Sequence, residues 1–153
     1  MSRNIGSTLP EPICQLLSGR DLAARWGQTI QLATIDAEGF PHFGILTYGE
    51  IVCTAPAQVR LGLYPNSSTS RNLRERGRAG LLLVAGPALY YLKGQAAEAA
   101  SHAPETARFD VTLHTVLVDD EPGSTMTSGL TFELASGKEA WLATAAKTLA
   151  ALV

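Results

Sequence analysis

Short segments with the apolar pattern of β-strands occupy the middle of the chain. In two of them, 28–35 and 59–63, residues on the two faces alternate in polarity, which is typical of a strand with one well-buried face. Asp36-Ala-Glu-Gly39 is a turn signal, because its glycine tolerates positive φ. The predicted strands cover 28–35, 41–47, 50–54, 59–63, 79–85, 89–99 and 108–118. Their shortness and the tight turns between them favour an antiparallel meander or barrel.

Three of these segments carry further information. The segment 79–85 is apolar throughout apart from one glycine, so we expect both of its faces to be covered. Gly94 lies inside 89–99 and predicts a bulge or a bend there. The segment 108–118 alternates again, and its apolar side is predicted to hold Phe109, Val111, Leu113 and Thr115.

Helical patterns flank the strands. Short helices are expected at 12–17, at 21–26 and between Ser67 and Gly77, because a glycine follows each of them closely. Apolar residues recur at helical spacing over 138–152, which predicts a C-terminal helix. Ser136, with a glutamate three residues later, is typical of a capping box at the start of that helix.

Composition limits the class of protein. The chain has 153 residues, of which 46% are hydrophobic and 17% charged, with a formal net charge of −2. This length fits one domain, 1–153, with its core in 28–118 and enough residues to bury it without staples. The net charge argues against a nucleic-acid binder. Because soluble domains average about a quarter charged residues, the shortage of charge favours a surface covered by a second copy.

The two cysteines, Cys14 and Cys53, form no Cys-x-x-Cys motif. We therefore expect two idle thiols in a reducing compartment. No apolar run reaches signal-peptide length near the N-terminus, and none reaches the roughly 20 residues of a membrane helix. The sequence thus predicts a soluble, cytoplasmic protein without membrane contact.

Common catalytic fingerprints are missing from the sequence. It holds no glycine-rich dinucleotide or NTP motif and no Gly-x-Ser-x-Gly. His42, His102 and His114 lie far apart without metal-ligand spacing, so no protein-bound metal is expected. The acidic run at 119–121 is interpreted as a solvated turn.

The segment 67–78 carries the clearest chemical signal. Hydroxyl residues precede a helix start, where free N–H groups and the helix dipole favour an anion. Arg71 follows in the first turn and Arg74 lies one turn further on the same face. Guanidinium groups donate paired hydrogen bonds to phosphate oxygens, so the segment can form a pocket for one phosphate. An N-cap followed by a solvated basic helix explains the same residues equally well.

Motif order adds a resemblance to a known family. Leu32-Ala-Thr-Ile-Asp-Ala-Glu-Gly-Phe-Pro-His-Phe-Gly44, then Ser67-Ser-Thr-Ser-Arg71-Asn-Leu-Arg74, then Tyr90-Tyr-Leu-Lys-Gly94 resemble successive motifs of the flavin-binding split-barrel proteins related to pyridoxamine 5′-phosphate oxidase. The resemblance spans about 32–96. It implies a mainly β fold, a six-stranded antiparallel Greek-key split barrel with small helices. It also implies a homodimer with two FMN molecules at the interface.

The resemblance assigns cofactor-binding residues by motif position. Hydroxyls of 67–69 and Arg71 would hold the FMN phosphate. The second strand of the hairpin would run along the ring and ribityl chain, and Tyr64 would shape the approach to the ring. The full set of expected cofactor-binding residues is His42, Phe43, Gly44, Tyr64, Asn66, Ser67, Ser68, Thr69, Arg71 and Asn72.

Two departures from the family pattern bear on cofactor and substrate. Thr69 stands where many relatives carry lysine, which leaves Arg71 as the nearest cation unless Arg60 or Arg74 compensates. No arginine follows Arg108, so a second cationic clamp for a phosphorylated vitamin is missing. Pyridoxamine 5′-phosphate oxidase activity itself is therefore not expected.

The resulting functional hypothesis is an FMN-binding oxidoreductase that passes hydride through the flavin and acts on an unassigned small molecule or electron donor. Because the flavin supplies the reactive atom, no catalytic acid or base is required of the protein, and none is assigned. The alternatives are a flavin store or sensor without turnover, and a degenerate barrel that has lost its cofactor. Deazaflavin or haem could replace FMN, haem only if a histidine such as His42 faces the cleft.

Overall fold

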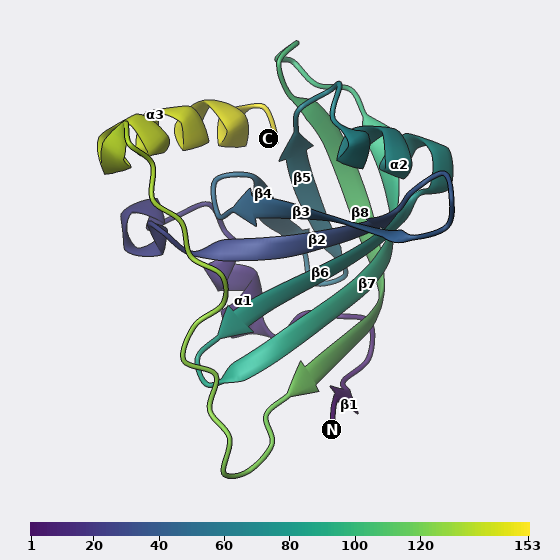
Figure 1. The fold of residues 1–153 in the computed structure, drawn as a ribbon, viewed down its shortest axis with the longest axis vertical. Helices are drawn as coiled ribbons and strands as arrows, with labels where there is room; N and C mark the ends of the chain where they lie inside the picture. The colour runs from purple at the N-terminus through teal and green to yellow at the C-terminus, as the bar shows by residue number, and fades with distance from the viewer.

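The protein folds around one curled antiparallel β-sheet, described for residues 1–153 by a computed structural model (Figure 1). The sheet has the strand order β3-β2-β6-β7-β8-β5-β4, and β1 pairs with β8 outside that path. The strands are β1 Arg3–Asn4, β2 Thr29–Ile35, β3 Pro41–Thr47, β4 Ile51–Ala55, β5 Gln58–Leu63, β6 Arg78–Ala85, β7 Ala88–Ala99 and β8 Ala107–Asp119. The helices are α1 Glu11–Leu16, the 3₁₀ turn η1 Leu22–Arg25, α2 Ser68–Arg76 and α3 Gly137–Ala150.

The expected barrel-like β fold is confirmed, but the sheet has eight strands where the family resemblance implied six. Each of the strands predicted from the sequence pattern is present within a few residues of its expected bounds. The unforeseen strand is β1, which pairs Arg3 with Val118 and Asn4 with Leu117. A strand of two residues is too short to show any period, so no pattern in the sequence indicates it.

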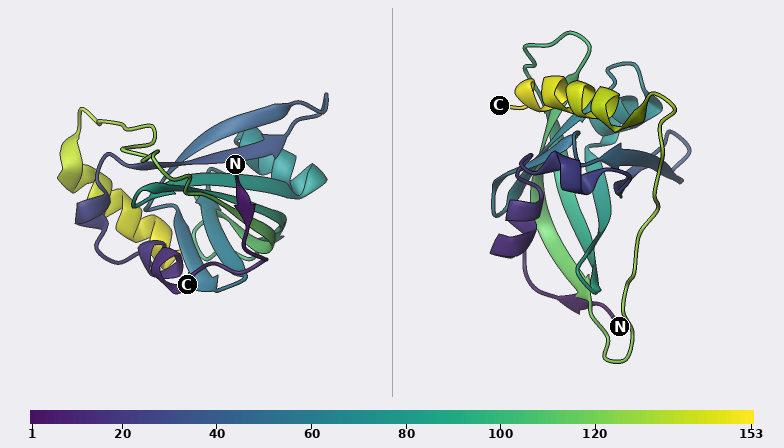
Figure 2. Two further views of the ribbon diagram at one scale, coloured as in Figure 1. Left: turned by 90° about the horizontal axis from the view of Figure 1, so that it is seen from below. Right: turned by 90° about the vertical axis from the view of Figure 1, so that its left-hand side faces the viewer.

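The sheet is curled (Figure 2), and a cluster of 22 buried hydrophobic residues forms the core. Alternate residues of β2 and β5, such as Ile30, Leu32 and Leu61, are completely buried there. The neighbouring residues of β2, including Gln31 and Ala33, face the other side and are half-buried. The period of two in the sequence therefore separates a closed inner face from a partly open outer face.

Gly94 forms the predicted bulge in the longest strand pair, β7 with β8. The register shifts between Lys93 and Gly94, where Lys93 pairs with Thr115 and Gly94 with Leu113. A Cβ at Gly94 would collide with the carbonyl oxygen of Thr112, so glycine is required by this close approach.

The same bulge corrects one expectation for β8. Phe109, Val111 and Leu113 are buried as predicted, but Thr115 is only half-buried and Val116 takes the inward position. The bulge leaves His114 as an extra residue, which reverses the alternation beyond it. The predicted inward face of β8 is therefore confirmed before the bulge, up to Leu113, and is wrong after it, at Thr115.

Strand β6 was expected to be covered on both faces, and this expectation is wrong for the single chain. Leu81 and Leu83 are buried on the inner face, whereas Leu82 and Val84 on the outer face are half-buried. Leu82 pairs with Gln31 of β2, which in turn pairs with Ile45 of β3, so these residues continue one outer face over three strands.

The helices begin and end close to their predicted positions. The C-cap of α2 is Gly77 with φ of 67°, the left-handed conformation that favours glycine. At α3 the expected capping box is absent, because the N-cap residue Ser136 makes no side-chain hydrogen bond to the helix. Neither α3 nor any other helix has the length and apolarity that crossing a bilayer requires.

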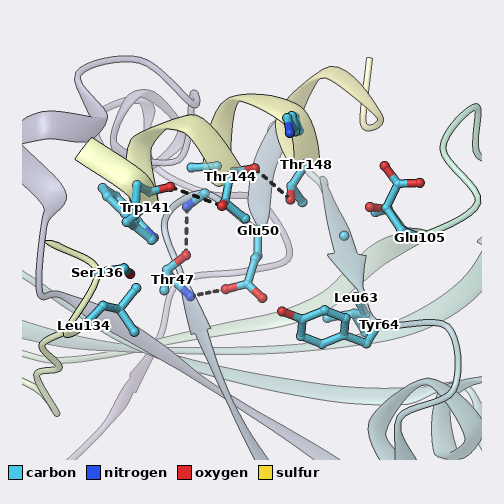
Figure 3. A pocket seen from close by; sticks show the side chains of 16 residues that line it. Thr47, Glu50, Leu63, Tyr64, Glu105, Leu134, Ser136, Trp141, Thr144 and Thr148 are labelled. Carbon is cyan, nitrogen blue, oxygen red and sulfur yellow. Dashed lines mark hydrogen bonds between the residues drawn. The ribbon is translucent and has the colours of Figure 1, made fainter. Parts of the chain in front are cut away.

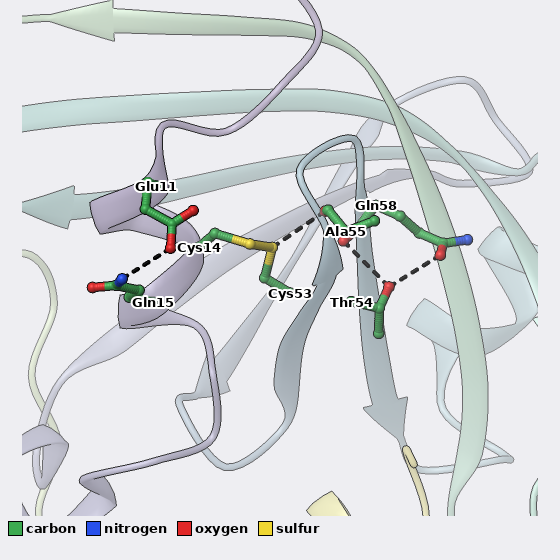
Figure 4. The surroundings of a disulfide bond; sticks show 7 residues. All are labelled: Glu11, Cys14, Gln15, Cys53, Thr54, Ala55 and Gln58. Atoms are coloured by element: carbon green, nitrogen blue, oxygen red, sulfur yellow. Dashed lines mark hydrogen bonds between the residues drawn. A yellow bond between two sulfur atoms is a disulfide. The ribbon is translucent and has the colours of Figure 1, made fainter.

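The expectation of two idle thiols is also wrong. Cys14 of α1 and Cys53 of β4 form a disulfide bond, with their Cα atoms 5.3 Å apart (Figure 4). The backbone N–H of Cys53 also donates to the carbonyl of Leu17, just after α1, at 2.7 Å. Together these contacts fasten α1 against the strand at one open edge of the sheet.

The C-terminal part of the chain returns along the barrel and closes its upper end. Residues 120–136 run along the length of the molecule to α3 (Figure 2), and Thr29 donates a side-chain hydrogen bond to Leu130 on the way. Trp141 of α3 packs against Trp26 and Phe132, with ring centroids 5.6 and 6.2 Å away.

Helix α3 approaches the sheet most closely at two glycines. A Cβ at Gly49 would collide with the side chain of Ala145, and one at Gly62 would crowd Thr148 and Leu152. Small residues at these two positions therefore let the helix lie directly on the ends of β3, β4 and β5.

Replacing Gly49 by alanine should displace α3. We expect Gly49→Ala to lower the free energy of unfolding by about 1–3 kcal/mol, the usual cost of forcing extra atoms into a packed contact. Gly129→Ala is the matched control, because a Cβ there meets Val84 at an ordinary 3.6 Å. Urea denaturation followed by tryptophan fluorescence measures both, and equal stabilities of the two variants would contradict this packing.

Candidate functional site

The start of α2 is organised by its own hydroxyl residues. Ser67 is the N-cap, and its Oγ accepts a hydrogen bond from the backbone N–H of Ser70 at 3.1 Å. The Ser70 hydroxyl, fully buried, donates to the carbonyl oxygen of Tyr64 at 2.7 Å. Two of the expected cofactor residues, Ser67 and Tyr64, are thus engaged in holding the helix start.

The first backbone donors of α2 stay free. The N–H groups of Ser68 and Thr69 make no hydrogen bond within the protein. The side chain of Ser68 is exposed and that of Thr69 half-buried. Free N–H groups at the positive end of a helix, with hydroxyls beside them, can bind one anionic group.

Strand β3 runs past this helix start and presents its two faces differently. Gly44 faces α2, because a Cβ added there would lie 3.2 Å from Thr69 Oγ1. His42, two residues away, lies on the same face and is half-buried. Phe43 points to the opposite, outer face, where 66% of it is exposed. The structure thus brings His42, Gly44 and Thr69 together and places Phe43 elsewhere.

Asn72 anchors α2 to the sheet. Its side-chain amide donates to Thr34 Oγ1 of β2 at 3.0 Å, and both residues are buried. A buried polar pair of this kind fixes the position of the helix, because losing either partner leaves the other unsatisfied. This contact gives Asn72 a structural role in the expected site.

The arginines around α2 differ in availability. Arg74 holds both carboxylate oxygens of Glu98 at 2.7 Å and also donates to the carbonyl of Pro65. The hydrogen bonds from Arg74 keep the pKa of Glu98 below its ordinary value. Arg76 is paired with Glu75. Arg71, which is exposed, is the one α2 arginine without an ion-pair partner.

The guanidinium of Arg60 is engaged with groups outside α2. It pairs with Asp110 at 2.6 Å and donates to the carbonyl of Leu152 at the end of α3. Burial acts to raise the pKa of Asp110, but the hydrogen bonds from Arg60 and Arg108 outweigh it and lower this pKa. Arg60 and Arg74 are therefore both held in ion pairs, unlike Arg71.

A pocket of about 460 Å³ lies beside this region, under α3 (Figure 3). Its walls come from the turn after β3, the end of β5, the segments that precede β8 and α3, and α3 itself, including the buried Trp141. Tyr64 borders the pocket, so the pocket adjoins the residues expected to approach a cofactor ring. The other residues around it that bear charge or hydroxyl groups are Thr47, Glu50, Glu105, Thr106, Ser136, Thr144, Lys147 and Thr148.

Glu50 is the residue of this pocket that sequence reasoning missed. Its Oε2 accepts a hydrogen bond from the backbone N–H of Thr47 at 2.6 Å, and no cation lies within 4.0 Å of its carboxylate. Burial raises the pKa of Glu50 above its ordinary value, although the bond from Thr47 works against the shift. A single acid at the start of a predicted strand, 50–54, carries no sequence signal, because its burial depends on the return of α3 over this part of the sheet.

Comparison of the sequence with known proteins finds a relative, and comparison of the structure finds proteins of the same fold. No protein-family model matches the chain. The uncharacterized protein YclD of Bacillus subtilis (strain 168) is 28% identical over 137 residues, which cover 86% of this chain and 87% of that protein. A candidate pyridoxamine 5′-phosphate oxidase from Lactobacillus delbrueckii superposes with a TM-score of 0.57 at 14% identity, covering 74% of this chain and 98% of the other.

The chain has the split-barrel fold of pyridoxamine 5′-phosphate oxidase-like proteins. HupZ from Group A Streptococcus shares it, with a TM-score of 0.54, 16% identity, and coverage of 70% of this chain and 94% of HupZ. A heme binding protein from Mycobacterium smegmatis also shares this fold. It superposes with a TM-score of 0.54 at 18% identity, covering 82% of this chain and 58% of that protein. At these identities the likeness establishes the split barrel, and the cofactor has to be argued from this chain's residues.

The buried carboxyl of Glu50 should appear in the pH dependence of stability. Because its pKa is raised on folding, the folded chain binds this proton more tightly than the unfolded chain, and ionisation of Glu50 lowers stability above the folded pKa. Glu50→Gln should therefore be more stable than the wild type at about pH 8. The advantage should vanish below about pH 4, under the pKa of an ordinary glutamate.

Urea denaturation at both pH values measures this difference. Glu38→Gln is the control, because Glu38 is exposed in the β2–β3 turn. A stability difference for Glu50→Gln that is the same at both pH values would show that the carboxyl is not perturbed.

Proposed function

We propose that this protein binds FMN at the start of α2 and acts as a homodimeric flavin-dependent oxidoreductase. The observation that carries the proposal is the group of unused donors beside β3. The N–H groups of Ser68 and Thr69 and the guanidinium of Arg71 have no acceptor in the protein. Free N–H groups and a guanidinium suit a phosphate monoester, the anionic end of FMN.

The available residues fit one phosphate. Hydroxyl and N–H groups of Ser68 and Thr69 would surround its oxygens, and Arg71 would supply the balancing charge. Asn72 holds the helix in place through Thr34, so the donors are positioned before a ligand arrives. Arg60 and Arg74 are both engaged in ion pairs, so neither is a free second cation for a phosphorylated substrate.

A second copy of the chain would cover the outer face of the sheet. Phe43 and Ile45 of β3 are 66% and 50% exposed there, and the outer residues of β6, on the other side of β2, are half-buried. Strand β3 is also an edge of the sheet, and exposed apolar edges invite pairing with another chain. A homodimer explains both the exposed apolar side chains and the continuous apolar sequence of β6.

The bound flavin would supply the hydride chemistry, and the protein would orient it. Tyr64 and Asn66, both exposed at the end of β5, are placed to border the ring. No residue of the chain is assigned as an acid or base, since the flavin carries the reactive atom.

The phosphate assignment predicts the effect of losing Arg71. Arg71→Ala should weaken FMN binding by about 1.5–3 kcal/mol, the range for a hydrogen bond to a charged group. Quenching of FMN fluorescence during a titration measures the affinity. Arg76→Ala, a change of the same charge in the same helix, should leave it unchanged because Arg76 is paired with Glu75 at the far end.

The outcomes separate the alternatives. Equal affinities of the wild type and Arg71→Ala would refute the phosphate assignment. A colourless protein that ignores added FMN would indicate a degenerate barrel, or a site for deazaflavin or haem if those bind instead. Bound FMN that NADH and NADPH both fail to reduce would favour a flavin store or sensor.

The dimer predicts that a charge on the outer face separates the subunits. Phe43→Glu should convert a dimer into a monomer at micromolar concentration, because a carboxylate would be buried without a partner. Sedimentation velocity measures the state, and Val153→Glu is the control at an exposed position of the C-terminus. A wild-type protein that sediments as a monomer would refute the dimer.

A further inference from the structure

The pocket under α3 has the size of a small-molecule site. Its volume of about 460 Å³ falls in the range of about 300–1,000 Å³ that ligand pockets occupy. Trp141, Leu63 and Leu134 supply apolar wall, and the turn holding Glu50 forms the floor (Figure 3). The chemistry of the polar lining then decides which ligand fits.

The Glu50 carboxylate has no counter-charge in the protein. Its hydrogen bonds come from Thr47, whose backbone N–H donates to Oε2 at 2.6 Å, and no cation lies within 4.0 Å of it. Figure 3 shows the side chain pointing into the pocket. A partly buried carboxylate without a counter-charge is costly, and a ligand that brings a cation offsets that cost.

The threonines of α3 reinforce this preference. The hydroxyl of Thr144 donates to the carbonyl of Ala140 at 3.1 Å, and that of Thr148 donates to the carbonyl of Thr144 at 3.2 Å. Since each hydroxyl has a single proton, both oxygens can only accept further bonds. The hydroxyl oxygens of Thr144 and Thr148 can therefore accept hydrogen bonds from a ligand, as the Glu50 carboxylate can.

The remaining charged groups of the lining are Glu105 and Lys147. Their charges are opposite in sign and cancel, so the net charge of the lining stays negative because of Glu50. The pocket thus combines an aromatic and aliphatic wall with two carboxylates, one ammonium group and several hydroxyls.

We propose that this pocket binds a small organic cation, an amine or amidine with a flat apolar body, through the Glu50 carboxylate. The cationic head would donate to Oε1 and the body would lie against Trp141. Tyr64 borders both this pocket and the proposed cofactor region. If the bound cation is the substrate that the flavin oxidises or reduces, that role rests on the proposed function. The binding of the cation to this pocket does not depend on the proposed function.

Benzamidine and benzoate are suitable probes, because they share a shape and differ in the sign of charge. Titrated into the full-length protein without cofactor, benzamidine should bind at least about tenfold more tightly than benzoate, as for a hydrogen bond to a charged group. Backbone amide shifts in NMR spectra should move at 47–50 and 141–148. Calorimetry supplies the affinities.

Two variants test the assignment to Glu50 and to this pocket. Glu50→Gln should lose about tenfold or more in benzamidine affinity, whereas Glu38→Gln, the same charge change in a distant turn, should keep it. Ala140→Trp should block binding by filling the pocket from an exposed position of α3. Because that variant leaves Glu50 untouched, it tests the pocket even if Glu50→Gln fails to fold.

Equal binding of benzoate, an unchanged affinity of Glu50→Gln, or shifts confined to other surfaces would each overturn the proposal. A protein that binds benzamidine as expected but never binds FMN would leave the pocket standing and refute the proposed function. The reverse result would refute the pocket alone.

Discussion

The bulged pairing of β7 with β8 is the constraint on which the rest of this structure depends. Strand β8 joins the two halves of the sheet, since β7 lies on one side of it and β5 on the other. Gly94 allows the strands to approach where any side chain would collide with Thr112, and a bulge at such a point bends and twists the sheet. The curl encloses one face as a core and leaves the other face partly exposed.

The two helices that matter for chemistry lie at the same end of this curled sheet (Figure 1). Helix α2 is tied down by the buried pair of Asn72 and Thr34, and α3 lies on the two glycines 49 and 62. One helix offers donors and a free guanidinium, while the other closes a pocket that offers acceptors. Tyr64 connects the two places, because it lines the pocket and its carbonyl accepts a hydrogen bond from Ser70 in α2.

Much of the fold and part of the site followed from the sequence. The strands, the bulge at Gly94 and the helix bounds were predictable, because burial of one face leaves a local period and glycine marks close approaches. The candidate phosphate site at 67–71 could be proposed from the sequence as well, since its donors are neighbours in the chain. Whether Arg74 and Arg60 are free to bind a ligand could not be predicted from the sequence. Their partners, Glu98 and the carbonyl of Leu152, come from distant parts of the chain.

What the sequence alone determined is therefore local: which segments are strands, where they turn, and which hydroxyls start α2. The tertiary structure decided what depends on long-range contact. It joined Cys14 to Cys53, made Thr115 face outward beyond the bulge, and half-buried Glu50 beneath α3. The physical reason is that hydrophobic periodicity reports burial residue by residue, whereas pairing, register shifts and the solvation of a charge are set by partners many residues away.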